Sequence, residues 1–493
     1  MSYQELVFLK GFNMQKNKLL SDMKQYFQTK SLYVYENSFA ERPGFQAIAV
    51  RISGEDYLIA TGERAREFEG KKEAFFYRCP MNHQNRLKLN VILPETKPVS
   101  FGSESTTFGF GDRLGKANYG QLKALAGYCD IKPVLAQQSM RELSLTGRTY
   151  SDVIDSAAWS VFKAGWKNGY AADGDHLKKK EEVQIAITAG CTMITLDCSE
   201  VLRNYTDQAE ISDIYGKISK QDRFEYEKCY LEKSYSSKVS FDRNRLMQTV
   251  VNYAGAVEMV RSIYFSLLQD SEIDLEISLD ETDIVTTAEA HFFIAMEMKK
   301  AGVRITSIAP KFKGQFQKAI DYIGDPEIFR RHLKEHVNIA NMFGHKISVH
   351  SGSDKFRIFK ILAKETNGFF HLKTSGTSWL EAVRLIARKN PQLFRDMYDN
   401  ARKSLTESKK YYVVDCTSNM IPNLDTVEDL ALESTLDEKN IRQLMHITYG
   451  FQLENQHIKE RLYHTLQQFS EEYDELIKTH FIHHLELLKK ESV

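Results

Sequence analysis

A histidine stands at the end of a short alternating segment, residues 346–356, with the sequence KISVHSGSDKF. Ile347 and Val349 would share one face of an extended chain and Ser348 and His350 the other, because successive strand side chains point to opposite sides. The small polar residues that follow are typical of a loop. The segment therefore predicts a strand whose carboxyl end presents an imidazole.

Other segments of strand character end in comparable side chains. The residues that reach the same end are Asp175, His176, Asp197, Asp280, Glu281, Lys311, His371 and Lys373, with Arg113 on the inward phase of the first strand. Imidazoles and carboxylates from different strands suit a divalent metal with open coordination positions. The lysines and the arginine would suit an anionic substrate. A lone histidine at a strand end is more often an ordinary polar residue, but several at one end favour a site.

Strands separated by helical stretches must position these side chains. This rhythm begins after Pro98 and is the signature of βαβ units and a parallel sheet. The strands are expected near Phe110, Ala136, His176, Leu196, Leu279, Ile308, Val349 and His371. Eight units close a (β/α)8 barrel, the TIM-like fold in which chemistry lies at the carboxyl ends of the strands. We expect this α/β barrel over residues 101–420; an open doubly wound sheet is the alternative, and VVDCT near Asp415 could be a further strand.

Three additions to the barrel are expected. Residues 1–100 predict a β-rich N-terminal domain or cap, with a short amphipathic helix followed by alternating segments, the last of them RLKLNVIL at 86–93. The polar stretch at about 200–250 is too long for an ordinary loop and predicts an insertion, which could act as a lid. Residues 421–493 carry apolar residues at helical spacing and predict a C-terminal helical element for packing or oligomerisation.

The composition narrows the function classes. Lys and Arg total 66 and Asp and Glu total 66, so charge favours neither a nucleic acid nor an anionic membrane as partner. The six cysteines contain no C-x-x-C pair, which is typical of reduced thiols. We find no signal-like stretch and no run of about 18 apolar residues, so a cytoplasmic protein is the expectation.

Several motifs have a plainer interpretation. His291 lies in an apolar helical run and predicts a core or helix-face histidine. His480, His483 and His484 are spaced so that they could bind adventitious metal, but a solvated helix face is the preferred interpretation. The glycines at 109–115 miss the dinucleotide-binding spacing by one residue. The sequence has no Walker loop, H-E-x-x-H or G-x-S-x-G motif.

Taken together, seven motifs between about Phe108 and about Ala382 resemble the tagaturonate epimerase family of hexuronate metabolism. They are TFGFGDRLG, DGDHLK, TAGCTMITLDCSE, SLDETD, TAEAHFF, KISVHSGSDKF and FHLKTSGTSWLEA, in this order. The resemblance implies a metal-dependent epimerase that interconverts D-tagaturonate and D-fructuronate, with a hexuronate as its small-molecule partner.

The resemblance also implies roles for individual residues. Asp175 would be the proton acceptor and Glu281 the proton donor, and His176 and His350 would be metal ligands. We choose His371 as the third ligand, on both its motif and its inward phase. Strict alternation in LEISLDE points Asp280 inward instead of Glu281, but strand ends often bulge, so Glu281 is preferred and Asp280 is held in reserve.

The two sugars differ at a carbinol carbon one position beyond the carbon next to the ketone, so simple enolisation cannot invert it. A retro-aldol cleavage with recombination on the other face and a two-base proton exchange both remain open. The competing functions are another metal-dependent barrel enzyme of sugar acids or ketoses, such as an aldolase or aldose–ketose isomerase, and a non-catalytic carbohydrate-binding protein.

Overall fold

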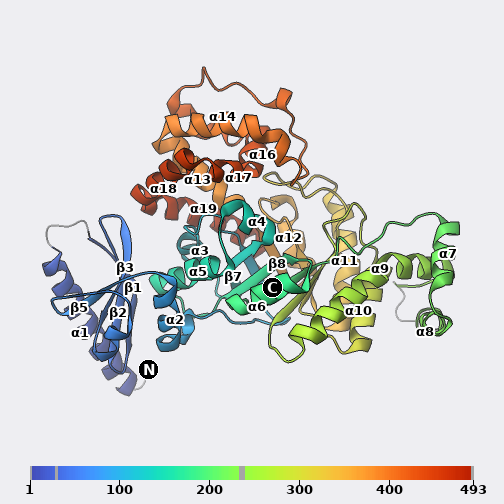
Figure 1. Ribbon diagram of the computed structural model, residues 1–493, viewed down its shortest axis with the longest axis horizontal. Coiled ribbons are helices and arrows are strands. Elements are labelled where there is room, and N and C mark those ends of the chain that lie inside the picture. Colours follow the sequence, from blue (N-terminus) through green and yellow to red (C-terminus); the bar gives the residue numbers. More distant parts are fainter. Residues whose placement is uncertain (1–2, 28–31, 233–238, 490–493) are drawn as a thin grey trace.

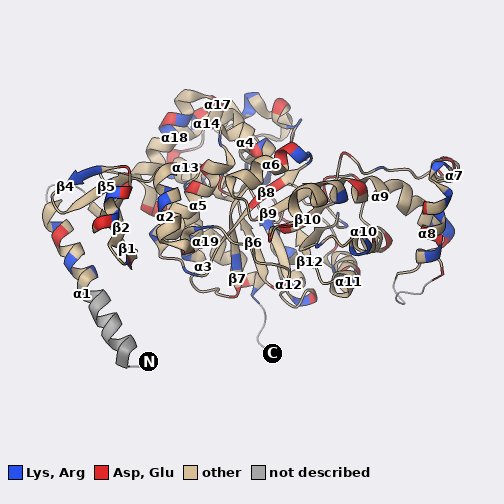
Figure 2. Ribbon diagram, turned by 60° about the horizontal axis from the view of Figure 1, so that its bottom comes forward, with Lys and Arg blue, Asp and Glu red and all other residues tan. Residues whose placement is uncertain are grey.

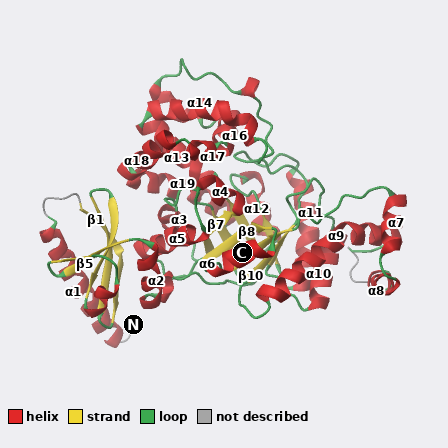
Figure 3. Ribbon diagram, viewed as in Figure 1, coloured by secondary structure: helices red, strands yellow, loops and turns green. Residues whose placement is uncertain are grey.

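Eight parallel strands close into a barrel at the centre of the molecule (Figures 1 and 3). The computed structural model describes residues 3–27, 32–232 and 239–489. The barrel strands are β6 (Thr106–Phe110), β7 (Ile131–Ser139), β8 (Ala171–Leu177), β9 (Met193–Asp197), β10 (Asp274–Ser278), β11 (Ser307–Ala309), β12 (Lys346–Val349) and β13 (Phe370–Thr374). β13 pairs with β6 and completes the ring. The predicted barrel and its eight strands are confirmed, the open sheet is excluded, and the residues around Asp415 form a loop.

Helices cover the outside of the barrel, as the βα rhythm predicts. They are α3 (Asn118–Leu125), α4 (Met140–Thr146), α5 (Tyr150–Ala164), α6 (Lys180–Ala189), α9 (Arg243–Ile263), α10 (Ala288–Ala301), α11 (Pro326–Phe343), α12 (Phe356–Glu365) and α13 (Thr377–Lys389). Side-chain caps begin α4, α5, α9, α10 and α11. For example, Thr149 and Asp152 form a reciprocal capping box at α5, and Gly165 ends this helix in the left-handed conformation. The outward strand residues, such as Leu196, pack beneath these helices in one large apolar core.

An antiparallel sheet precedes the barrel, as the N-terminal alternation predicts. It contains β1 (Leu32–Arg42), β2 (Phe45–Ile52), β3 (Glu55–Thr61), β4 (Lys71–Glu73) and β5 (Phe76–Pro80), in the order β1-β2-β3-β5-β4. One face packs on Leu19 and Met23 of α1 (Tyr3–Tyr26) and on Phe27, which follows this helix. The other face packs on Trp159 and Phe162 of α5, which joins the sheet to the barrel.

The segment RLKLNVIL is a helix, so its prediction as a strand is wrong. It lies in α2 (His83–Ile92), where the Asn82 side chain caps the first turn. Leu89 and Ile92 are buried, whereas Val91 is 74% exposed. This burial follows the helical period and not the period of two that the sequence suggests, because the capping asparagine starts a helix before the apolar residues.

The stretch around residues 200–250 projects from the barrel and carries two short helices, α7 (Gln208–Lys217) and α8 (Lys220–Tyr230) (Figure 1). Basic and acidic residues are intermixed along both of them (Figure 2). The described residues of this stretch line neither of the two cavities at the carboxyl end of the barrel. They therefore give no support to the idea of a lid.

The C-terminal part is helical, as its spacing predicts. It contains α14 (Pro391–Ser408), α15 (Leu432–Thr435), α16 (Lys439–Ile447), α17 (Tyr449–Glu454), α18 (Gln456–Gln468) and α19 (Ser470–Leu488). α19 packs on the barrel wall, where the ring of Phe481 lies 5.0 Å from that of Phe110 on β6. Within the described ranges, no helix is long and apolar enough to span a membrane.

Four buried histidines form a hydrogen-bonded chain outside the barrel. His291 Nδ1 lies 2.9 Å from His336 Nδ1, and His291 Nε2 lies 2.8 Å from His345 Nε2. His336 Nε2 in turn lies 3.2 Å from His332 Nε2, which donates to the Thr286 carbonyl. The core position expected for His291 is confirmed.

Because these four histidines are buried, we expect the free energy of unfolding to fall in mild acid. Burial lowers the pKa of His345 to about 3 and that of His332 to about 4, and holds the pKa values of His291 and His336 well below the usual range. The unfolded chain binds these protons below about pH 6.5, whereas the folded chain does so only near pH 4 or lower. Stability is therefore complete above pH 6.5 and falls as the pH drops, by about 2 kcal/mol per histidine at pH 5.

Urea unfolding followed by circular dichroism at pH 8 and pH 5 measures this loss. His345→Gln should reduce the pH dependence by about one proton, whereas the exposed His464→Gln should leave it unchanged. Identical pH dependence in the wild type and His345→Gln would show that the buried histidines are not its source.

Candidate active site

A bulge at the end of β8 brings two neighbouring side chains to the barrel interior. The pairing of β8 with β9 slips between Gly174 and Leu177, and His176 has a φ of +54°. A regular strand would point Asp175 and His176 to opposite faces, but the bulge re-aims one of them. A positive φ at a residue other than glycine costs free energy, and such strained residues are often found at functional sites.

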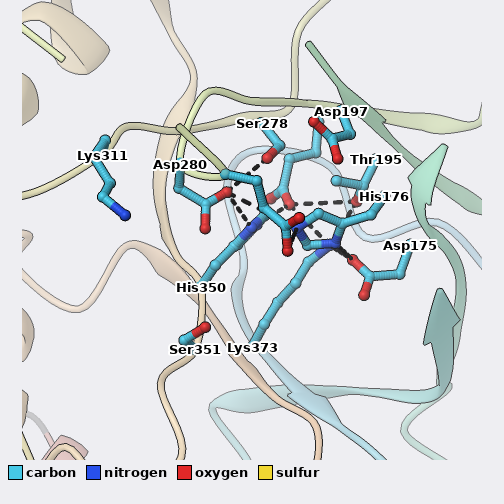
Figure 4. A network of polar contacts seen from close by, with 12 residues as sticks. Asp175, His176, Thr195, Asp197, Ser278, Asp280, Lys311, His350, Ser351 and Lys373 are labelled. Carbon is cyan, nitrogen blue, oxygen red and sulfur yellow. Dashed lines mark hydrogen bonds and ion pairs between the residues drawn. The ribbon is translucent and has the colours of Figure 1, made fainter. Parts of the chain in front are cut away.

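Three potential metal ligands gather at the carboxyl ends of β8, β10 and β12 (Figure 4). His176 Nε2, His350 Nδ1 and a carboxylate oxygen of Asp280 all lie within 4.8 Å of one another. Both imidazole nitrogens are buried and, within the described chain, neither takes part in a hydrogen bond. Two imidazoles and one carboxylate are a donor set that suits a divalent transition metal, and they leave coordination positions open.

The other nitrogen of each histidine is fixed by a carboxylate. His176 Nδ1 lies 2.7 Å from Asp175 Oδ1, and His350 Nε2 lies 2.7 Å from Glu276 Oε1. Such carboxylates set the tautomer and aim the opposite nitrogen at a metal. Burial alone would lower the pKa of His350, but Asp280 and Glu276 raise it to about 9, and the Asp175 carboxylate likewise raises the pKa of His176 to about 10.

Lys373 is enclosed by acidic groups beneath this cluster. Its Nζ lies 2.7 Å from Asp173 Oδ2, 2.7 Å from Asp175 Oδ1 and 2.9 Å from Glu276 Oε1, and it also donates to Thr195. These carboxylates outweigh burial and raise the pKa of Lys373 well above its usual range. Its hydrogens are already taken, so the predicted role of Lys373 in binding a substrate carboxylate does not fit the structure.

The cluster opens into two connected cavities. The inner one has a volume of about 30 Å³ and is lined by Asp175, His176, Glu281 and His350, among others. The outer one has a volume of about 660 Å³ and shares Glu281 and His350 with it. The outer cavity falls within the usual size range of small-molecule sites, whereas the inner one admits only a few atoms.

Two basic side chains line both cavities. Lys318 and Arg141 line both of them, together with Ser351 and Tyr412. Lys318 Nζ donates to Ser351 Oγ at 2.8 Å, and the Arg141 guanidinium lies over the ring of Tyr412 and 3.6 Å from Glu281. Burial lowers the pKa of Lys318. The pair could bind an anionic group of a ligand.

Three predicted site residues do not line the inner cavity. Arg113 is buried against Glu142 at 2.9 Å and against the ring of Tyr449, so its charge is already neutralised. His371 belongs to a lower layer of the barrel, two residues before Lys373, and its Nδ1 contacts Thr107 Oγ1 at 2.9 Å. Lys311 lines only the outer cavity.

Asp280 lies in the cluster with His176 and His350, where His371 was expected. β10 ends at Ser278, so the alternation of side chains no longer governs the two acidic residues that follow. Ser278 donates to Asp280 Oδ1 at 2.6 Å and turns this carboxylate toward His350, while Glu281 reaches the cavity from the same loop.

Several residues at the site were not predicted from the sequence. Asp173 and Glu276 share the inward phase of their strands with Asp175 and Asp280, so this signal was present. Lys318, Arg141 and Tyr412 come from long connections and from the start of a helix, where no periodic pattern marks a residue that faces the site.

Known proteins share this architecture over most of the chain. The family model for tagaturonate epimerase matches residues 35–488. The chain belongs to the tagaturonate epimerase family. Its resemblance therefore extends beyond the barrel motifs, to most of the N-terminal sheet and to the C-terminal helices, and the chain is an enzyme of the carbohydrate epimerase class.

Individual relatives agree. The tagaturonate/fructuronate epimerase of Thermotoga maritima is 38% identical over 469 residues, which cover 92% of this chain and 97% of the relative. The glycerol-bound crystal structure of the fructuronate–tagaturonate epimerase of Cohnella laeviribosi is 40% identical, with a TM-score of 0.91 and coverage of 96% of this chain and 99% of that one.

Proposed function

We propose that this enzyme interconverts D-tagaturonate and D-fructuronate and that a divalent metal supports the reaction. The observation that carries the proposal is the group of His176, His350 and Asp280, set beside Arg141 and Lys318 in a barrel of this family. Incubating metal-reconstituted protein with tagaturonate and measuring both epimers tests it. Failure to form fructuronate would refute the assignment.

The residues at the site fit a metal. His176 and His350 each have one buried nitrogen without a hydrogen bond in the described chain, and Asp280 supplies an oxygen between them. A metal held there would act as a Lewis acid that polarises the substrate's oxygen atoms. His371, the ligand first expected, is replaced by Asp280 in this proposal.

We favour the retro-aldol route, because the carbon to be inverted is not next to the ketone and its hydrogen is not acidic. A carboxylate removes the proton of the hydroxyl on that carbon. The bond to the neighbouring carbon breaks, its electron pair passes toward the ketone, and an aldehyde and an enediolate result. After the aldehyde turns, the bond forms again on the other face and the proton returns to the new hydroxyl.

Asp175 and Glu281 are the candidates for moving this proton, as acceptor and donor. Burial would raise the pKa of Asp175, but His176 and Lys373 hold it well below its usual range. For Glu281 the effect of burial is likewise outweighed by His176 and Arg141, which lower its pKa. Both groups are therefore ionised in the free enzyme at neutral pH, and Glu281 must first receive a proton before it can donate one.

Lys318 and Arg141 are proposed to bind the uronate carboxylate, in place of Lys373 and Arg113. The outer cavity leaves room for the sugar chain between these cations and the metal ligands. A charge-assisted hydrogen bond of this kind contributes about 1.5–3 kcal/mol.

Lys318→Met should therefore raise the KM for tagaturonate about 10-fold to 100-fold, with a much smaller effect on a neutral ketose. Steady-state kinetics with both substrates measures the difference. Lys313→Met is the matched control, because Lys313 is exposed on the same loop and lines neither cavity. Equal increases in KM for the two substrates would contradict the role of Lys318.

Isotope exchange distinguishes the two routes. In the retro-aldol route the hydrogen on the inverted carbon stays in place throughout, so turnover in D₂O should leave no deuterium at this carbon. NMR or mass spectrometry of the re-isolated sugars measures the incorporation. Deuterium at this position after full equilibration would favour the two-base exchange instead.

A further inference from the structure

We propose that Asp354, His480 and His484 form a second, structural metal site, for a cation of the Zn²⁺ type. Asp354 lies in the loop after β12, and the two histidines lie one turn apart on α19, so they share a helix face. Each residue offers a ligand atom within 4.8 Å of the others. The site shares no residue with the group around His176.

The two histidines are largely buried, so their prediction as a solvated face is wrong, whereas His483 is exposed.

The ligand atoms converge on one carboxylate oxygen. Asp354 Oδ1 lies 3.3 Å from His480 Nε2 and 3.4 Å from His484 Nε2. Neither approach has hydrogen-bond geometry, and Asp354 Oδ1 is a buried atom without a hydrogen-bond partner in the described ranges. The Asp354 side chain is only 7% exposed. A buried acceptor of this kind is costly unless a cation or a donor faces it.

Neighbouring groups orient the three ligand side chains in the way that is common around bound metals. His484 Nδ1 lies 3.0 Å from the His480 carbonyl, so Nδ1 carries the hydrogen and Nε2 keeps its lone pair. His480 Nδ1 faces Glu381 Oε1 at 3.5 Å. Arg442 pairs with the other oxygen of Asp354, Oδ2, at 2.9 Å and leaves Oδ1 directed at the histidines. Carbonyl and carboxylate partners on the far nitrogen are typical of metal-bound histidines.

Two contacts would change when an ion binds. The Asp354 backbone N–H donates to His484 Nε2 at 3.1 Å, and the Thr377 hydroxyl contacts His480 Nε2. The ion would replace both as the partner of these lone pairs. The Thr377 hydroxyl oxygen lies beside the site and could complete a four-coordinate set.

Such an ion would connect the C-terminal helix to the active-site loop. Asp354 follows His350 by four residues and has a φ of +59°, a conformation that few residues other than glycine adopt. A cation held by Asp354 and α19 would keep this loop in place next to Ser351. Two imidazoles and one carboxylate are ligands that Zn²⁺ accepts in a tetrahedral site.

Metal content tests the proposal. Wild-type enzyme incubated with Zn²⁺ and passed through gel filtration should retain two equivalents by mass spectrometry. His176→Ala/His350→Ala should retain one equivalent, and adding Zn²⁺ to this variant should raise its Tm. His484→Gln and the nearly isosteric Asp354→Asn should each lose one equivalent from the wild-type value, with unchanged far-UV circular dichroism.

His483→Gln is the matched control. It removes an exposed histidine next to His484 and should keep two equivalents. Co²⁺ gives a second readout, because His176→Ala/His350→Ala loaded with Co²⁺ should show the visible absorption of a tetrahedral ion. The proposal fails if Asp354→Asn and His484→Gln both retain the wild-type zinc content, or if a folded His176→Ala/His350→Ala variant binds no zinc. If His176→Ala/His350→Ala does not fold, the zinc contents of the wild type and Asp354→Asn still test the proposal.

Discussion

Lys373→Met should lower the free energy of unfolding by about 3–5 kcal/mol and abolish activity. The Lys373 side chain is 4% exposed, and its ammonium group lies within 3 Å of Asp173, Asp175 and Glu276. Without it, three carboxylates would remain together in the barrel interior with no cation among them. Breaking a buried ion pair from one side is costly for this reason, because the remaining charge loses both water and partner. Urea unfolding followed by circular dichroism measures the change.

Lys311→Met provides the control for this experiment. Lys311 lines the outer cavity and is not among the cations that pair with the interior carboxylates. Its replacement should change the free energy of unfolding by less than about 0.5 kcal/mol. If both variants unfold at the same urea concentration as the wild type, Lys373 does not hold the barrel interior together.

His350→Asn should reduce turnover by more than about 100-fold, because losing even an outer-shell partner of a metal ligand costs 10-fold to 100-fold. The variant should also lose one equivalent of metal. We expect this loss of metal because His350 Nδ1 faces Asp280 while Glu276 fixes the other ring nitrogen. Steady-state kinetics and metal analysis of the purified protein measure both effects together.

The exposed His464→Asn should change neither turnover nor metal content. Removing the metal from wild-type enzyme with a chelator should reproduce the loss of turnover, and adding metal back should restore it. A His350→Asn variant that remains active with its full metal content would overturn the assignment of His350 as a ligand.

Much of the candidate site could be predicted from strand alternation. His350 was found in this way, whereas Asp175 and His176 were found from their position at a strand end and from their motif, because alternation would point these two neighbours to opposite faces. All three line the inner cavity. The structure places His371 two residues before Lys373 and in contact with Thr107, because alternation identifies inward residues but does not tell which layer of the barrel they occupy. Alternation also points Asp280 inward, but only the structure places its carboxylate beside His176 and His350.

The charges around the site could not be predicted in the same way. Lys373 and Lys318 are both lysines near strand ends or in loops, and the sequence does not distinguish them. Lys373 is enclosed by carboxylates from β8 and β10, whereas Lys318 stands at the cavity on a long connection. Which cation is free to bind a substrate depends on partners that are distant in the sequence.

The sequence by itself determined the eight barrel strands and the end of the barrel at which chemistry occurs, because side-chain alternation and the βα rhythm are local patterns. It also indicated the family through the order of its motifs. The tertiary structure decided which side chains cluster with His176 and His350, the enclosure of Lys373 by carboxylates and the burial of His480 and His484 against Asp354. These depend on ion pairs between distant segments and on loop conformations beyond the strand ends, where no periodic constraint acts on the sequence.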